Sequence, residues 1–205
     1  MIDKSLKEFS ELAASKAPVP GGGGVSGLVG SLAASLGEMV TNLTYGKAKY
    51  IQYTSEIVDI RKELELLRSN LLDCINLDAQ AFEPLSKVYS MKDDPDYDIK
   101  MEECLKNAAK PPLLILKYCT RIIDLDERLA VIGSKISVSD VATSVMLAHG
   151  AMYGGYVNVL VNTRLMKDRE YADNLTKEAA SLLDEFSPRA LNCYDDVCKR
   201  LTDNG

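Results

Sequence analysis

The chain has 205 residues, of which 46% are hydrophobic, and it carries a formal net charge of −6. A chain of this size can bury one sizeable core, so we expect a single domain over residues 1–205. The acidic balance argues against a nucleic-acid binder, whose affinity depends on a clustered basic face. The five cysteines show no C-x-x-C spacing and the only histidine is His149. This pattern favours reduced thiols in a cytoplasmic protein and argues against a zinc site.

The N-terminal region starts with a charged amphipathic pattern and not with a cleavable signal. Residues 3–16 are expected to form a helix, in which Ser5 and Glu8 have the spacing of a capping box. The run between Lys16 and Glu38 has no charge. Its first third is proline and glycine, which leaves only about thirteen helical residues, too few to cross a bilayer. We therefore expect a helix buried in protein and no membrane span.

The segment Pro18-Val19-Pro20-Gly21-Gly22-Gly23-Gly24 precedes a helical pattern from Val25 to about Thr44. The prolines make a stiff approach, and the glycines leave backbone N–H groups uncovered at the positive end of the helix dipole. An anionic or carbonyl-bearing ligand could contact the backbone here. A tight turn between two packed helices is the alternative. The segment does not match a P-loop, because no Gly-Lys-Ser/Thr follows the glycines.

Two stripes run along this helix. The large apolar residues form the face that we expect in the core: Val25, Leu28, Val29, Leu32, Leu36, Met39, Val40 and Leu43. Small residues at alternating steps of four and three form the other stripe: Gly23, Gly27, Gly30, Ala34, Gly37, Thr41 and Thr44. A small stripe lets another backbone or a flat ligand come close. Close helix packing and a pocket wall are both open interpretations.

The longest periodic segment runs from residue 53 to residue 88 and contains one residue of the wrong kind. Its apolar seam comprises Tyr53, Ile57, Ile60, Leu64, Leu67, Leu71, Cys74, Ala81, Leu85 and Val88, and Asp78 occupies a position within it. A carboxylate there loses hydration, which raises its pKa toward the range of acid-base chemistry. The alternative is a structural acid paired with a lysine or a helix end. Pro84 is expected to bend the helix one turn beyond Asp78.

The second half of the chain predicts four further elements. The acidic turn at 91–97 precedes a short helix to about Ala109, and the next helix covers 113–132 with Gly133 as its C-cap. After a polar loop, Ser137 and Asp140 have capping-box spacing for another helix. The last helix, 170–201, is expected to be interrupted near Pro188. No strand pattern stands out, so we predict an all-α domain of six to eight helices.

The helix after Ser137 has a core face of Val141, Val145, Met152, Tyr156 and Val159. Its second stripe is small at the centre and polar at both ends: Ser137, Asp140, Ser144, Ala148, Ala151, Gly155, Asn158 and Asn162. This stripe is suited to lie across from the glycine stripe with a polar ligand between them. Alternatively, Asp140 only caps the helix, and Asn158 and Asn162 only cross-link helices.

An ordered set of motifs resembles the formiminotetrahydrofolate cyclodeaminase / methenyltetrahydrofolate cyclohydrolase family over about residues 5–185. The motifs are Pro18-x-Pro20-Gly21-Gly22-Gly23, Met39-Val40 with Leu43-Thr44, Gly46-Lys47-x-Lys49-Tyr50, Asp78-x-x-Ala81-Phe82, Ala108 with Pro112-Leu113, Gly133 with Ser139-Asp140, and Asn158-Val159-x-x-Asn162. Gly24, Ser134, Ser137 and Asn76 depart from the residues usual in the family.

The resemblance implies an all-helical homodimer that acts on reduced folate, with or without a polyglutamate tail, and needs no metal or redox cofactor. The family embraces two reactions, hydrolysis of 5,10-methenyltetrahydrofolate to 10-formyltetrahydrofolate and cyclodeamination of formiminotetrahydrofolate. Both pass through a tetrahedral carbon between N5 and N10. Because no formiminotransferase domain is fused here, we expect the cyclohydrolase. The competing class is a non-enzymatic helical adaptor, in which the small stripes serve packing alone.

The resemblance also implies roles for single residues. Asp78 matches the acid of the family's active site and is the expected general acid/base. The Pro20–Gly23 segment is expected to approach the ligand through its backbone, and Asp140 and Asn158 to hold polar pterin edges. Lys47 is expected to receive the glutamate tail or to support charge at the reacting centre, and Lys49 to bind the tail or remain solvated. Because small stripes favour close helix pairing, we expect the site to border a two-fold interface.

Overall fold

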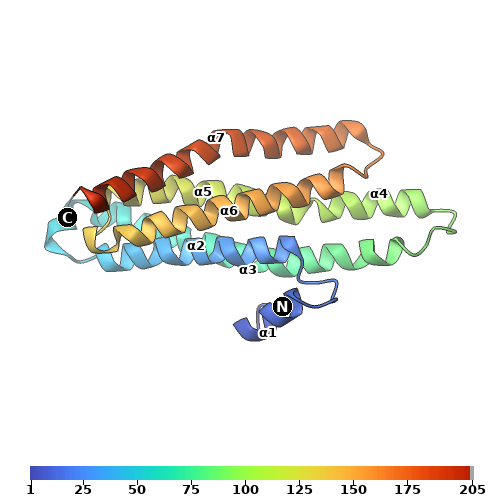
Figure 1. Cartoon of the computed structure of the whole chain (residues 1–205), viewed down its shortest axis with the longest axis horizontal. Helices are drawn as coiled ribbons and strands as arrows, with labels where there is room; N and C mark the ends of the chain where they lie inside the picture. Colours follow the sequence, from blue (N-terminus) through green and yellow to red (C-terminus); the bar gives the residue numbers. More distant parts are fainter. Residues whose placement is uncertain (204–205) are drawn as a thin grey trace.

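Long α-helices run side by side along one axis in the computed structural model, which describes residues 1–203 (Figure 1). Seven α-helices and two 3₁₀ segments make up the described chain, and it contains no strand. The predicted all-α fold of six to eight helices is confirmed. In order the elements are α1 (Leu6–Ala13), α2 (Gly22–Thr44), η1 (Ala48–Tyr53), α3 (Thr54–Val88), α4 (Tyr97–Ala108), α5 (Lys110–Ile132), η2 (Lys135–Ser137), α6 (Val138–Thr163) and α7 (Arg169–Thr202).

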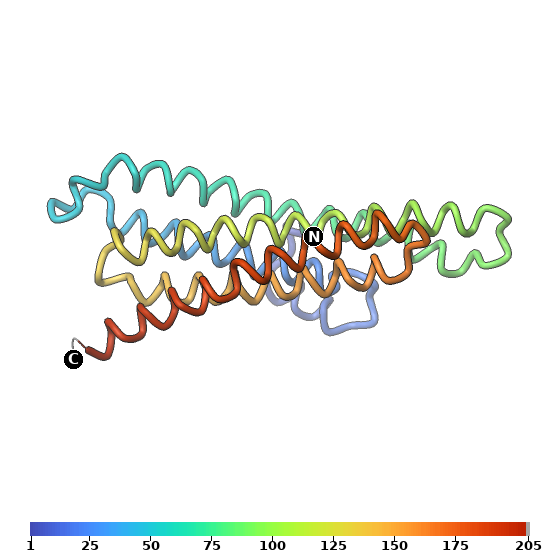
Figure 2. The backbone as a smooth tube through the Cα atoms, turned by 90° about the horizontal axis from the view of Figure 1, so that it is seen from above, coloured from blue at the N-terminus to red at the C-terminus, as the bar shows by residue number. Residues whose placement is uncertain are grey.

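The centre of the bundle is formed by α2, α3, α5 and α6, with α7 packed on α5 and α6. Its fully buried side chains include Leu64, Leu71, Ile122, Leu129 and Met152. The predicted seam of α3 is confirmed, since all of its apolar members from Ile57 to Cys74 are buried. The turn between α3 and α4 lies at one end of the bundle, and η1 and η2 lie together at the other (Figure 2).

Two helices pass through prolines. Pro84 lies inside α3, and Pro188 lies inside α7, which continues from Arg169 to Thr202. The predicted interruption at Pro188 is therefore wrong. A proline removes one backbone hydrogen bond, but buried residues on both sides of Pro188, among them Leu183 and Ala190, hold α7 on the bundle. The helix bends along its length without ending (Figure 1).

The burial of α2 is the reverse of the sequence prediction. Every residue of its small stripe is buried, whereas Val25, Leu32, Met39 and Leu43 are exposed. Of the large apolar residues predicted for the core, only Val40 is fully buried. The small stripe faces inward because α3 and α6 approach too closely for larger side chains. The outward face of α2 is therefore an apolar surface without a partner in the protomer.

Contacts of single glycines show how close that approach is. A Cβ added to Gly27 would lie 3.0 Å from the backbone oxygen of Leu71 on α3. A Cβ added to Gly154 on α6 would lie 2.1 Å from the Ser26 hydroxyl oxygen on α2. Helices meet at such distances only where one of them has no side chain at the contact. Along most of its length, therefore, the small stripe serves helix packing and leaves no room for a ligand.

Helix α2 is also the one described helix that is long and apolar enough to cross a membrane by length and composition. The glycines from Gly22 onward are helical. The uncharged part of this helix is therefore longer than the thirteen or so residues that the sequence predicted. More than half of its apolar stretch is buried inside the bundle. A core helix of a soluble protein passes the same test.

A buried carboxyl joins three helices at the centre. Asp126 of α5 is fully buried, and its Oδ2 lies 2.6 Å from the Ser144 hydroxyl of α6. The same hydroxyl donates to the carbonyl oxygen of Ala33 on α2 at 2.8 Å. A hydroxyl has one hydrogen, and a carbonyl can only accept. The hydrogen between Ser144 and Asp126 therefore belongs to the carboxyl, in agreement with the burial that raises the pKa of Asp126 well above its usual value.

Asn162 compensates for a proline. Pro112 has no N–H, so the carbonyl of Ala108, four residues earlier, lacks the donor that a helix would supply. The side-chain amide of Asn162 donates to that carbonyl at 3.2 Å and to the carbonyl of Asn158 at 2.8 Å. The interpretation of Asn162 as a cross-link between helices is confirmed.

The caps were predicted in part. Ser5 and Glu8 form the expected capping box, and Gly133 is the C-cap of α5. The capping box at Ser137 and Asp140 is wrong, because the Ser137 side chain accepts no bond from the helix. Its hydroxyl instead donates to the carbonyl of Ser134 at 3.2 Å. The 3₁₀ turn of η2 brings these two residues together.

Candidate active site

The acid that the sequence singled out lies directly against the glycine segment. Helix α2 begins midway along the bundle, so its N-terminus opens beside the middle of α3 (Figure 1). A Cβ added to Gly23 would lie 2.2 Å from Asp78 Oδ1. Burial raises the pKa of the Asp78 carboxyl, and the nearby N–H of Gly24 partly opposes that shift. Asp78 remains partly exposed and can therefore reach a ligand.

Asn158 lies across the same helix terminus. Its Nδ2 is 3.0 Å from the Cβ position of Gly22 and donates to the Gly154 carbonyl of its own helix at 2.8 Å. Gly21 is the N-cap of α2 with open space at its Cβ position, while Pro20 is buried and packs beside Gly24. The structure thus brings together Gly21, Gly22, Gly23, Asp78 and Asn158 of the predicted site. Pro20 packs against the same turn of α2.

This group of residues has the parts of an acid-base site. The N–H groups of Gly22 and Gly23 belong to the first turn of α2, so no preceding helical turn can accept from them, and the N-cap residue Gly21 has no side chain to do so. They point, with the positive end of the helix dipole, toward the space next to Asp78. A group that shifts between neutral and negative would be stabilised there, with a carboxyl in reach for proton transfer.

The other predicted residues lie elsewhere in the protomer. Asp140 is in the first turn of α6, eighteen residues before Asn158 on the same continuous helix, which corresponds to about 27 Å at 1.5 Å per residue. Lys47 and Lys49 lie at the η1 end, beyond the C-terminus of α2. One protomer therefore does not bring Lys47, Lys49 and Asp140 to Asp78.

The η1 end contains an ordered polar cluster of its own. The Lys47 ammonium donates to the Ser134 hydroxyl at 3.0 Å, and the N–H of Ser134 donates to Thr44 Oγ1 at 2.8 Å. The N–H of Lys135 donates to the phenol oxygen of Tyr50 at 3.1 Å. The sequence analysis placed Thr44 in the small stripe of α2 and assigned no role to Tyr50 and Ser134. The sequence offered one sign that these two residues belong to the site: Tyr50 ends one of the family motifs, and Ser134 directly follows the Gly133 of another.

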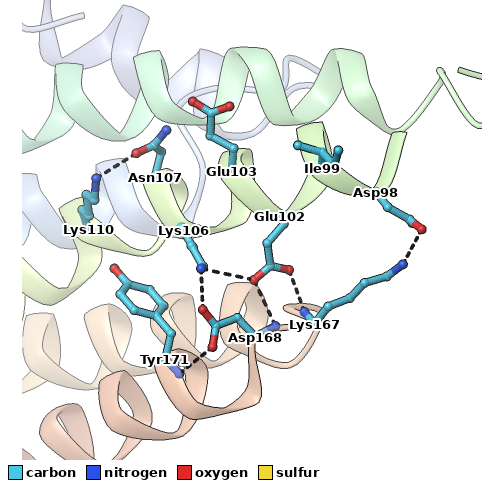
Figure 3. Close-up of a pocket in the computed structure, with 10 residues that line it drawn as sticks. All are labelled: Asp98, Ile99, Glu102, Glu103, Lys106, Asn107, Lys110, Lys167, Asp168 and Tyr171. Carbon is cyan, nitrogen blue, oxygen red and sulfur yellow. Dashed lines mark hydrogen bonds and ion pairs between the residues drawn. The ribbon is translucent and has the colours of Figure 1, made fainter. Parts of the chain in front are cut away.

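A separate surface pocket of about 590 Å³ lies between α4 and the start of α7 (Figure 3). Its lysines already have partners: Lys106 binds Asp168 at 2.6 Å, Lys110 binds Asn107 at 2.8 Å, and Lys167 pairs with Asp98. Glu102 accepts from the N–H groups of Lys167 and Asp168, at 2.6 and 3.2 Å. All of these contacts except the Lys110–Asn107 bond attach α4 to the loop before α7. An anion would have to displace them, so this pocket is a weaker candidate than the α2 terminus.

No group of three or more His, Cys, Asp or Glu side chains within residues 1–203 is placed to hold a metal ion. All five cysteines are free thiols. His149 contacts Ser187 through Nε2 at 2.8 Å and packs edge-on against Tyr153. It therefore joins α6 to α7, away from the α2 terminus.

Comparison with known proteins identifies the fold and the family. The model of the formiminotransferase-cyclodeaminase family matches residues 5–181. A methenyltetrahydrofolate cyclohydrolase of Methylorubrum extorquens is 32% identical over 200 residues, which cover 95% of this chain and 96% of that protein. A formimidoyltransferase-cyclodeaminase of Dictyostelium discoideum is 30% identical over 183 residues, but the match spans only 34% of its length.

Among solved structures, a formiminotetrahydrofolate cyclodeaminase of Thermotoga maritima superposes with a TM-score of 0.86. It is 31% identical, and the match covers 98% of this chain and 97% of that one. These relatives are enzymes, which disfavours the adaptor interpretation. The chain belongs to the formiminotransferase-cyclodeaminase family.

Proposed function

We propose that this protein hydrolyses 5,10-methenyltetrahydrofolate to 10-formyltetrahydrofolate, with Asp78 as the general base. The observation that carries the proposal is the partly buried Asp78 carboxyl against the first turn of α2, whose Gly22 and Gly23 N–H groups have no acceptor within the helix. The relative in Methylorubrum extorquens, matched over nearly its full length, is a methenyltetrahydrofolate cyclohydrolase and supports this choice of reaction. No metal or redox cofactor takes part in the proposed reaction.

In the proposed reaction, Asp78 takes a proton from a water molecule that adds to the carbon between N5 and N10. The resulting tetrahedral carbon carries a hydroxyl. The C–N5 bond then breaks as N5 takes up a proton and the hydroxyl loses its hydrogen to form the formyl C=O. Free N–H groups of Gly22 and Gly23 stabilise the oxygen as charge develops on it. The side-chain amide of Asn158 holds a polar edge of the pterin.

The second candidate reaction is cyclodeamination of formiminotetrahydrofolate, favoured by the similarity to the cyclodeaminase of Thermotoga maritima. There N10 attacks the formimino carbon and ammonia leaves. The same carboxyl would move the proton at nitrogen, because both reactions share a tetrahedral carbon between N5 and N10. Assays with both substrates decide between them.

We further propose that the active unit is a homodimer formed through the apolar face of α2. This face carries Val25, Leu32, Met39 and Leu43, and the neighbouring face of α6 adds exposed Tyr153, Val157 and Val161. Several large apolar side chains exposed along two neighbouring helices are typical of a protein interface. A two-fold axis near the middle of α2 would place the N-terminus of one α2 beside the C-terminus of the other.

Such a dimer explains why the predicted site residues occupy both ends of the bundle. Lys47, Lys49 and Asp140 of one protomer would complete the site at Asp78 and Asn158 of its partner, and the dimer would hold two sites. The lysines would face the glutamate tail of the substrate, whether it has one glutamate or several. Asp140 would hold the pterin edge opposite Asn158. A cytoplasmic location agrees with a folate substrate.

The first experiment follows the decay of the methenyltetrahydrofolate absorbance with purified wild-type protein and with Asp78→Asn, above the spontaneous rate. We expect enzyme-dependent decay that is lost in the variant. Mixing Asp78→Asn with Lys47→Met tests the shared site, because mixed dimers would hold one site with both native residues. Recovery of up to about half of the wild-type activity per mixed dimer supports the dimer, and no recovery contradicts it.

A further inference from the structure

The cluster at the η1 end is built around Ser134, which is only 2% exposed. Its N–H donates to Thr44 Oγ1, and the Thr44 hydroxyl donates to the carbonyl of Val40 at 2.7 Å. Its own hydroxyl accepts from Lys47. Thus the end of α2 fixes a buried serine, and that serine fixes the position of an exposed ammonium group.

The same serine contacts the phenol of Tyr50. The N–H of Lys135 donates to the phenol oxygen at 3.1 Å, and both this bond and the nearby Ser134 hydroxyl lower the pKa of Tyr50. The charge of Lys49, whose ammonium lies 5.7 Å from the Tyr50 ring centroid, acts in the same direction, as does that of Lys47. A phenol with two cations nearby releases its proton more readily than a free tyrosine.

The phenol oxygen of Tyr50 is an acceptor in this cluster. The amide of Lys135 can only donate, so its bond ends on an oxygen lone pair of Tyr50 and does not use the phenol hydrogen. Tyr50 is also partly exposed, so its hydroxyl can reach a ligand from outside the protomer.

We propose that Tyr50 is the second proton-transfer residue of the reaction, and that Ser134 is its positioning residue. In the dimer proposed above, Tyr50 would reach the substrate from the partner opposite Asp78. The inference rests on the proposed function and names a residue for a step that Asp78 alone leaves open. That step is the delivery of a proton to N5 as the C–N5 bond breaks.

The protons balance with two residues. Addition of water gives one proton to Asp78 and forms the C–O bond. When the C–N5 bond breaks, N5 takes the proton of Tyr50 and the new hydroxyl loses its hydrogen as the formyl C=O forms. The phenolate regains this proton through solvent, and Asp78 returns its own to solvent. The net release is one proton, as conversion of a methenyl cation to a neutral formyl group requires.

Two residues also suit the geometry of the reaction. Water oxygen and N5 are different atoms bonded to the same carbon, so a single carboxyl would have to move from one to the other between steps. Groups from two protomers can flank the carbon and act in turn without rearrangement. At this contact Lys47 binds the neutral hydroxyl of Ser134 and not an acid. Its positive charge therefore still attracts an anionic substrate.

The test is Tyr50→Phe, which keeps the ring and its contact with Lys49 but removes the hydroxyl. We expect kcat to fall about 100-fold with KM changed only a few-fold, and the alkaline limb of the pH profile to disappear. Tyr45→Phe is the matched control, because Tyr45 is an exposed residue at the same end of α2 whose ring contacts Arg61. It should behave as wild type.

Ser134 is tested by rescue. Ser134→Ala should lower kcat in the same direction but less, and Ser134→Thr, which restores a hydroxyl, should recover most of the loss. Melting temperatures of all variants separate misfolding from loss of chemistry. If Tyr50→Phe keeps kcat within about twofold of wild type while Asp78→Asn is inactive, the inference is wrong and the proposed function stands. If wild type itself acts on neither substrate, the proposed function fails and this inference with it.

Discussion

The carboxylate of Asp78 occupies the space that any side chain on Gly23 would need. A Cβ at Gly23 would lie 2.2, 2.6 and 2.8 Å from Oδ1, Cγ and Oδ2 of this residue, all closer than real Cβ contacts allow. The glycine therefore lets a partly buried acid sit against the first turn of α2. Flexibility of the glycine backbone is a lesser factor, because Gly23 is helical and has no positive φ.

Gly23→Ala should consequently displace Asp78 and abolish activity, while the protein stays folded. Gly21→Ala is the matched control, since nothing lies within 4 Å of its Cβ position and its φ of −101° suits any residue. We expect activity in the first variant to fall at least about 100-fold, as for loss of a general base. Equal activity of the two alanine variants would show that the contact with Asp78 is not needed for the reaction.

The pH dependence of the reaction follows from the burial of Asp78. Burial raises the pKa of its carboxyl, and the base form is the active one in the proposed reaction. As pH falls through this raised pKa, kcat/KM should decline, and the decline should begin at a higher pH than for an ordinary aspartate. A profile of kcat/KM from pH 4 to pH 9 measures it. A profile that is flat down to the usual aspartate range would exclude Asp78 as the base.

The sequence predicted the composition of the α2 terminus but not the layout of the whole site. Asp78 stood out because it broke a seam of period 3.5, and seams of that kind report burial directly. Lys47 and Asp140 belong to the same set of motifs but lie at the other end of the bundle. Order along the chain does not reveal which residues share an end, because that depends on helix length and direction.

Hydrophobicity alone could not predict which face of α2 is buried. Both of its faces lack charge as far as Glu38, so the large apolar residues were the natural core candidates. Which face turns inward is decided by the distance between α2, α3 and α6, and that distance is a property of the assembled bundle. The network of Tyr50 and Ser134 was missed for a similar reason, since eighty-four positions separate them in the sequence.

Leu32→Glu should separate the proposed dimer. Leu32 is 46% exposed on the apolar face of α2, so a charge there costs little in the protomer but would be buried without a partner in an interface. Leu66→Glu on α3, at a site that is 60% exposed, is the matched control. Light scattering after size exclusion should give a monomer only for the first variant, together with a loss of activity. A wild-type monomer with full activity would contradict the shared site.

Asn162→Ala should lower stability because it leaves the Ala108 carbonyl without a donor. Asn162 is 8% exposed, and an unsatisfied buried carbonyl costs about 1–3 kcal/mol. Asn158→Ala, one turn earlier, loses only a bond to its own helix, so it should impair substrate binding more than stability. Urea unfolding and KM, measured on both variants, separate the two roles. Equal destabilisation by both changes would contradict the assignment of Asn162 as the residue that compensates for Pro112.

Asp126 should make the stability of the protein depend on pH. The native state holds its carboxyl as the proton donor to Ser144, and burial raises its pKa well above the value near 3.8 of the unfolded chain. Unfolding therefore releases a proton at any pH between the two pKa values, so the free energy of unfolding falls as pH rises through that window. The stability that the neutral Asp126 carboxyl contributes is fully present below the pKa of the unfolded chain. It is lost as pH rises through the pKa of the folded protein.

The variant Asp126→Asn isolates this effect, because its amide can still donate to Ser144 and has no proton to release. The groups that face Asp126 are Ser144 of α6, Cys193 of α7 and the backbone at Gly37 of α2, and none of them bears an acidic charge at neutral pH. Urea unfolding from pH 4.5 to pH 8 should show the variant gaining stability over wild type as pH rises. Asp59→Asn, an exposed carboxylate on α3, should show no such trend. If the difference in the free energy of unfolding between Asp126→Asn and wild type stays constant across this pH range, the carboxyl is ionised in the native protein. It then does not donate to Ser144.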